Sequence, residues 1–145
     1  MKPTINWIVL VNARTAKVFE NRGPGKGLVA LGGKSWQADE IGEHRDKAGR
    51  GHSIIGPGAA AVEETDLQLQ SEIRFAREVA EHLLQAFGAK EFDRLILAAG
   101  PHMLGLLRAQ VDDRLKAVTI SEIAKDLSAL PPAQLEVHIG ESIAV

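Results

Sequence analysis

INWIVLVN, from Ile5 to Asn12, is a continuous apolar run that is rich in branched side chains. Runs of this kind are typical of a strand buried on both faces at the centre of a sheet. Thr15 to Arg22 follows a tight turn and alternates apolar with polar side chains, which predicts an antiparallel hairpin partner. Leu28 to Trp36 predicts a third strand, in which we expect Gly32 and Gly33 to form a bulge. The chain therefore opens with an antiparallel meander.

The apolar period then changes to that of a helix, from about Glu64 to Phe87. We expect Thr65 or Asp66 to cap its start and Gly88 to end it in a left-handed conformation. The apolar stripe comprises Leu69, Ile73, Ala76, Ala80, Leu83, Leu84 and Phe87, widened by Phe75 and Val79. This stripe predicts the helix face that packs on the sheet.

Strands and helices alternate in the rest of the chain. Arg94 to Ala99 and Ala117 to Ser121 predict strands, while Pro101 to about Ala109 and Pro131 to Ile139 predict helices. Strand-helix-strand units cross right-handedly and pair in parallel, so the late strands should add beside the first strand. The expected fold class is α/β, a three-layer arrangement with a mixed five-stranded sheet. This element order is found in ribonuclease H-like folds.

Composition limits the classes of protein to consider. A chain of 145 residues fits one domain, residues 1–145, and its formal net charge of −2 provides no broad basic field for nucleic acid. With no cysteine, disulfides and thiolate catalysis are excluded. The amino-terminal apolar run is too short for a signal peptide or a membrane span, so we expect a cytoplasmic protein.

Asp39 to Gly58 (DEIGEHRDKAGRGHSIIGPG) has many glycines and almost no periodicity, which predicts a long, exposed, flexible loop at about residues 39–61. Its second half places Lys47, Arg50 and His52 among glycines, without an acid from Lys47 onward. Cationic side chains on a pliable backbone suit phosphate contacts. A solvated loop without a ligand is the alternative that the residues leave open.

No catalytic motif accompanies this loop. A ribonuclease H-like nuclease would hold two metal ions with carboxylates on its central strands. The strands predicted at Ile5 to Asn12 and Arg94 to Ala99 carry none, and Asn12 stands where an acid would be expected. The histidines and acids of residues 43–52 match no compact metal-ligand spacing. We therefore assign no catalytic residue, no metal and no cofactor.

Three segments are more specific: Ala48 to Ser53 (AGRGHS), Ile73 to Glu81 (IRFAREVAE) and Lys125 to Pro132 (KDLSALPP). Together they resemble the bacterial host attachment protein family, described as required for attachment to host cells. That family is similar to the middle domain of archaeal and eukaryotic peptide-chain release factors, which is ribonuclease H-like. In those factors a Gly-Arg-Gly-Gly-Gln loop precedes the long helix and enters the peptidyl-transferase centre. Here Gly49-Arg50-Gly51 is followed by His52-Ser53, one residue shorter and without the glutamine.

The resemblance implies a non-catalytic factor that contacts RNA or the ribosome through this loop. Two alternatives stay open: a factor that supports host attachment through protein or glycan contacts with the attachment machinery, and a peptidyl-tRNA esterase. The exposed edge of the meander also leaves a homodimer open. The candidate contact residues are Arg45, Lys47, Arg50, Gly51, His52 and Ser53.

Overall fold

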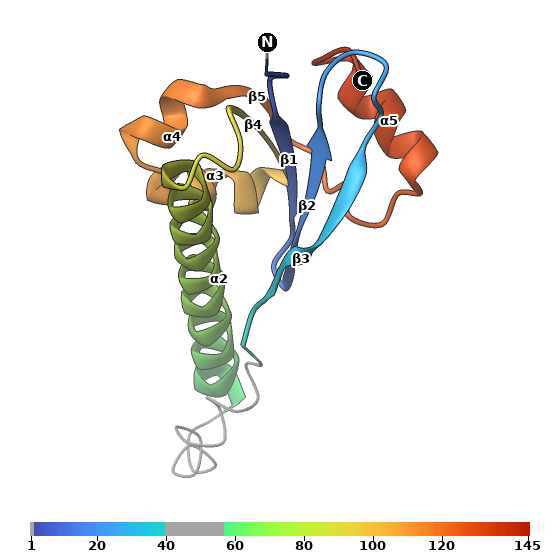
Figure 1. The fold of residues 1–145 in the computed structure, drawn as a ribbon. Coiled ribbons are helices and arrows are strands. Elements are labelled where there is room, and N and C mark those ends of the chain that lie inside the picture. Colours follow the sequence, from blue (N-terminus) through green and yellow to red (C-terminus); the bar gives the residue numbers. More distant parts are fainter. Residues whose placement is uncertain (1, 40–56) are drawn as a thin grey trace.

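The computed structural model describes residues 2–39 and 57–145, and its sheet follows the expected topology (Figure 1). The strand order is β3-β2-β1-β4-β5, so the predicted mixed five-stranded sheet is confirmed. The elements are β1 (Asn6–Val11), β2 (Thr15–Asn21), β3 (Val29–Gln37), α2 (Pro57–Gly88), β4 (Arg94–Ala99), α3 (Pro101–Gln110), α4 (Asp113–Val118), β5 (Thr119–Ile123) and α5 (Pro132–Gly140).

Strand β1 is central because its side chains are buried on both faces of the sheet. It pairs antiparallel with β2 and parallel with β4, while β3 and β5 form the two edges. Trp7, Val9 and Val11 pack on the face that α2, α3 and α4 cover. Ile8 and Leu10 pack on the opposite face, against α5. The alternation along one strand thus builds both cores of the predicted three-layer fold (Figure 1).

Helix α2 starts earlier than its apolar stripe predicts. It begins at Pro57, so Thr65 and Asp66 lie inside the helix and the prediction that they cap it is wrong. A proline fits the first turn of a helix, since its missing N–H group would have no partner there, and the alanines that follow favour the helix. Residues 57–61, expected in the loop, therefore belong to α2.

The stripe of α2 is correct in its second half. Phe75, Val79 and Leu83 are almost fully buried, whereas 39% of Leu69 is exposed. Leu69, expected in the core, is thus partly exposed, and Figure 1 shows that α2 is longer than the strands that it covers.

Helix α2 ends by a turn that the sequence did not predict. Gly88 is its last residue, and the left-handed conformation falls instead on Lys90, with a φ of 62°. The N–H of Lys90 donates to the Phe87 carbonyl at 3.0 Å, and that of Glu91 donates to the Ala86 carbonyl at 3.0 Å. These bonds satisfy carbonyls that the helix end leaves open.

The region before the last strand also differs from the prediction. Residues Ala117 and Val118, expected in a strand, end the short helix α4, and β5 begins at Thr119. The carboxylate of Asp112 accepts the backbone N–H of Leu115 at 3.1 Å and caps this helix. Because Leu115 is buried, both the cap and the core favour a helical turn here.

None of the described helices is both long and apolar enough to cross a membrane.

Candidate nucleic-acid interface

The contact residues predicted from the sequence lie outside the described residues, since all of Arg45, Lys47, Arg50, Gly51, His52 and Ser53 fall within 40–56. The described residues on either side fix where this segment joins the fold. The N–H of Ala38 donates to the carbonyl of Arg14 at 2.8 Å, which holds the end of β3 beside the β1–β2 turn. Helix α2 starts at the same end of the molecule (Figure 1).

At that end of the sheet, the side chain of Asn12 forms hydrogen bonds with the backbone of the β1–β2 turn. Its Oδ1 accepts the N–H groups of Arg14 and Thr15, both at 2.8 Å, and its Nδ2 donates to the Ser128 Oγ at 3.0 Å. Asn12 therefore shapes the β1–β2 turn. Within the described residues, no group of three histidine, aspartate or glutamate side chains could hold a metal ion.

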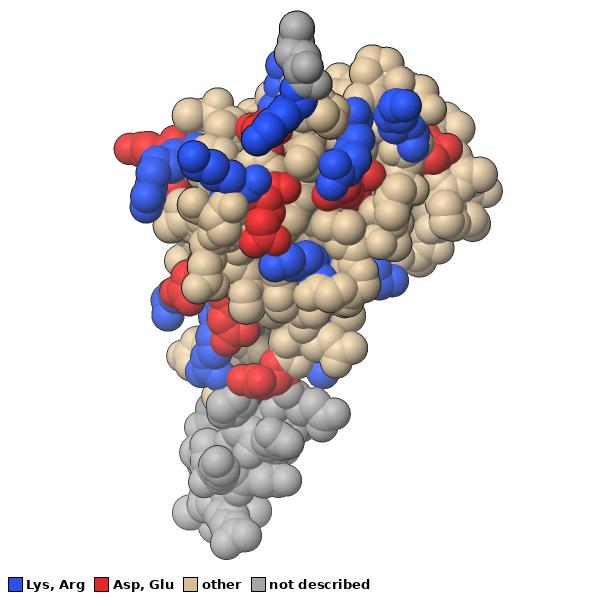
Figure 2. All heavy atoms as spheres, in the orientation of Figure 1, with Lys and Arg blue, Asp and Glu red and all other residues tan. Residues whose placement is uncertain are grey.

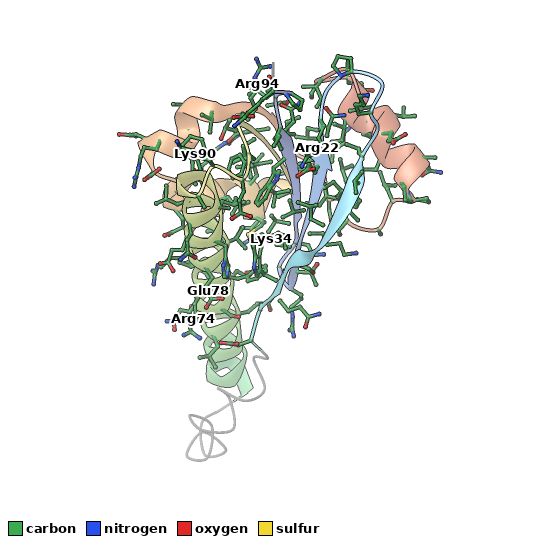
Figure 3. All side chains as sticks on the ribbon, in the orientation of Figure 1. Arg22, Lys34, Arg74, Glu78, Lys90 and Arg94 are labelled. Atoms are coloured by element: carbon green, nitrogen blue, oxygen red, sulfur yellow. The ribbon has the colours of Figure 1, made fainter. Side chains whose placement is uncertain are left out.

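A charged face lies between β3 and α2. Figure 2 shows lysine and arginine side chains gathered over its upper part, with acidic side chains between them. Figure 3 identifies four of the cations: Arg22 after β2, Lys34 on β3, Lys90 after α2 and Arg94 on β4. We call these four residues the basic rim. They come from four segments, so only the folded chain brings them to one face.

Two members of the basic rim are neutralised by acids. Arg22 Nε lies 2.6 Å from Glu20 Oε1, and Lys34 Nζ lies 3.0 Å from Glu91 Oε1. For Lys90 and Arg94, the part of the chain that the structure describes provides no ion-pair partner. Their charges are therefore available to an anionic partner.

Three members of the basic rim, Arg22, Lys34 and Lys90, line a hollow of about 580 Å³ beside the end of α2. Trp7 forms part of its wall, although only 1% of the side chain is exposed. Its ring stacks on Phe92 with a centroid distance of 4.6 Å, and no described residue accepts a hydrogen bond from its Nε1. The sequence predicted that Trp7 lies in the central strand, but it did not indicate that its side chain lines a hollow.

The predicted bulge in β3 is confirmed, and it lines the same hollow. Phe19 pairs with Ala30 and Lys17 pairs with Ser35, so residues 31–34 stand opposite Val18 alone. Gly32 and Gly33 lie in this bulge, and a Cβ atom added to either would meet nothing within 4 Å. Neither has a left-handed φ. The bulge thus presents bare backbone to the hollow.

Further along the face, Trp36 of β3 stacks on His82 of α2. The ring centroids are 4.5 Å apart and the planes are inclined by 3°. Since His82 is exposed, this stack closes β3 onto α2 at the surface. Residues so far apart in the chain gave no sign of this contact in the sequence.

Comparison with known proteins gives a family and a fold. Residues 7–139 match the family described as "Protein required for attachment to host cells". An uncharacterized protein of Rickettsia prowazekii is 36% identical over 73 residues, a match that covers 49% of each chain.

Among solved structures, the crystal structure of the archaeal translation termination factor aRF1 superposes with a TM-score of 0.51 at 14% identity. The superposition covers 96% of this chain and 35% of the termination factor, so the chain matches about a third of that protein. The expected release-factor-like fold is therefore confirmed.

Proposed function

Because the chain belongs to the family of proteins required for attachment to host cells and shares a fold with a translation termination factor, we propose that it is a non-catalytic factor that contacts RNA. The observation that carries the proposal is the pair of uncompensated cations, Lys90 and Arg94, on a face shaped from four segments. Lysine and arginine bind the phosphate backbone of RNA without reading its sequence. Its site of action is then the cytoplasm, as a partner of the ribosome or of free RNA.

The shape of the face favours an extended partner. Helix α2 has 32 residues, which at 1.5 Å per residue makes it about 48 Å long. The basic rim lies near one end of α2, and residues 40–56 join the fold at the other end. Since that segment contributes Arg45, Lys47, Arg50 and His52, we propose that it binds RNA as well, with Gly51 and Ser53 allowing close approach. A single strand running along α2 would meet both ends.

Binding to a single-stranded RNA oligonucleotide and cosedimentation with ribosomes test this proposal. Lys90→Gly with Arg94→Ala removes two cations of the basic rim, and we expect affinity to fall about tenfold at low salt. Lys47→Ala with Arg50→Ala should weaken binding to a similar extent.

The matched control is Lys116→Ala with Lys125→Ala, which removes the same charge from exposed positions on α4 and after β5. This variant should bind as the wild type does. No binding by the wild type, or equal losses in the rim variant and the control, would contradict the proposal.

A second candidate function is support of host attachment through protein or glycan contacts, which the family's description favours. It requires the protein, or a partner that it acts through, to reach the cell surface. Fractionation of cells separates the two functions. Recovery of the protein with the outer surface favours direct attachment, and recovery with ribosomes favours RNA contact.

A further inference from the structure

We propose that the outer edge of β5 binds an extended, acidic peptide segment of a partner protein, which adds to the sheet as a further strand. The site consists of the unpaired edge of β5 and of a pocket beside it, which β5 shares with α3 and α4. None of the four residues of the basic rim lines this pocket. The inference therefore goes beyond the proposed function, since it concerns another partner and another part of the surface.

Strand β5 pairs on one side only, so half of its backbone groups face away from the sheet. It lies at one end of the strand order, next to β4 alone. Among the described residues, no other backbone hydrogen bond reaches residues 120–123. A row of free N–H and C=O groups is a template for another strand, and several peptide-binding domains capture extended segments in this way. The edge itself therefore favours a peptide in the β conformation.

A bulge in β5 leaves one apolar residue out of the ladder. Leu95 pairs with Thr119 and Ile96 pairs with Ser121, so Ile120 has no partner on β4. The Ile120 side chain is 44% exposed and lines the pocket. Bulges at sheet edges often re-aim a side chain toward a functional surface. Ile120 thus offers an apolar contact directly beside the free edge.

The pocket beside this edge accepts an apolar side chain such as leucine. Its volume is about 500 Å³, with Ile120 on one side and the buried Leu97 and Val111 beneath it. Successive residues of a strand point to opposite faces of the sheet, so every second side chain of an added strand would face the pocket. An apolar residue of the peptide would enter the pocket, and the residue two positions away would lie over its charged wall.

The charge of the pocket favours an acidic partner. Its lining carries two cations, Arg108 and Lys116, and one acid, Glu122. Arg108 Nε lies 2.8 Å from Glu122 Oε1, so this pair is balanced. In the described part of the chain no acid forms an ion pair with Lys116, whose charge is left for a glutamate or aspartate of the peptide. A second copy of this chain would bring two such cations to one interface, which disfavours self-association through this edge.

Peptide binding, followed by the amide resonances of the protein, tests this inference. The probe is a short peptide, Thr-Leu-Thr-Glu-Thr-Leu-Thr-Glu-Thr, whose leucines and glutamates share one face of a strand. A counterpart replaces both glutamates with lysine. Two further versions carry N-methyl groups on alternate residues, so that each version lacks the N–H donors on one side of the strand.

We expect the acidic peptide to shift the amide resonances of residues 120–123. The lysine peptide should bind at least about tenfold more weakly, because it brings like charge to Lys116. One N-methylated version should not bind, and the other should bind as the parent peptide does, since only one side of the added strand faces β5.

A substitution in the protein tests the same contact. Ile120→Asp should raise the dissociation constant of the acidic peptide at least about tenfold, because it removes the apolar contact and repels the glutamates. The matched control is Val137→Asp on α5, which gives another exposed apolar residue the same charge and should leave peptide binding unchanged. Urea denaturation shows whether either variant has lost stability, and the peptide versions test the contacts on the unaltered chain.

The inference is wrong if no peptide moves the β5 resonances, if the glutamate and lysine peptides bind equally, or if both N-methylated versions bind equally. Shifts of residues 120–123 with protein concentration alone would assign the edge to a second copy instead. Displacement of the peptide by a uridine oligonucleotide would assign it to RNA. Because none of these results depends on RNA binding by the basic rim, this inference and the proposed function can fail separately.

Discussion

Lys90 combines an unfavourable backbone conformation with a charge that the proposed function needs. A left-handed φ of 62° is costly for a residue with a Cβ atom, and glycine relieves it. We expect Lys90→Gly to raise the free energy of unfolding by about 1 kcal/mol, measured by urea denaturation, while RNA affinity falls. If both the free energy of unfolding and the RNA affinity fell, the lysine side chain would stabilise the turn. The reduced binding would then follow from damage to the fold.

Asp112 makes the stability of the folded state depend on pH in the acid range. The N–H of Leu115 lowers the pKa of its carboxyl below the ordinary value of 3.8, and the side chain of Arg114 lowers it further. A lowered pKa stabilises the folded state above the unfolded-state value, and this contribution is lost as the pH falls through the folded-state pKa. We expect the wild type to exceed Asp112→Asn in stability at pH 6, and the difference to narrow below pH 3.8. A difference that is constant with pH would contradict this account.

At the scale of elements, the depth of burial along α2 distinguishes residues that one apolar stripe groups together. Leu83 has no exposed surface, whereas 39% of Leu69 is exposed. We expect Leu83→Ala to cost about 3 kcal/mol of unfolding free energy, because it leaves a cavity, and Leu69→Ala to cost less than about 0.5 kcal/mol. Urea denaturation of both variants is the measurement. Similar losses would place Leu69 in the core and contradict the packing described.

The elements that could be predicted are those whose own residues determine them. A continuous apolar run marks β1 as a strand buried on both faces, and the apolar period marks α2. Helix α4 was not predicted because its formation depends on one side-chain cap, at Asp112. The residues that follow, Ala117 to Ser121, favour a strand. The start of α2 escaped because its first turns lie beyond the sheet and carry no apolar stripe.

At the scale of the whole molecule, the sheet order was predictable because the right-handed crossover leaves few ways to add parallel strands to β1. The hollow was not. Trp7, Gly32 and Lys90 come from distant parts of the sequence, and only the pairing of β1, β2 and β3 with the turn after α2 brings them together. The sequence predicted the bulge correctly, but it did not predict that the bulge lines a hollow.

The salt dependence of RNA binding tests the central claim most directly, since phosphate contacts release counterions. The logarithm of the association constant should fall linearly with the logarithm of salt concentration. For a single strand, removing two phosphate contacts with Lys90→Gly and Arg94→Ala should reduce the steepness of this line by about 1.4. Lys116→Ala with Lys125→Ala should leave the slope unchanged. A rim variant that keeps the wild-type slope would contradict RNA contact through this face.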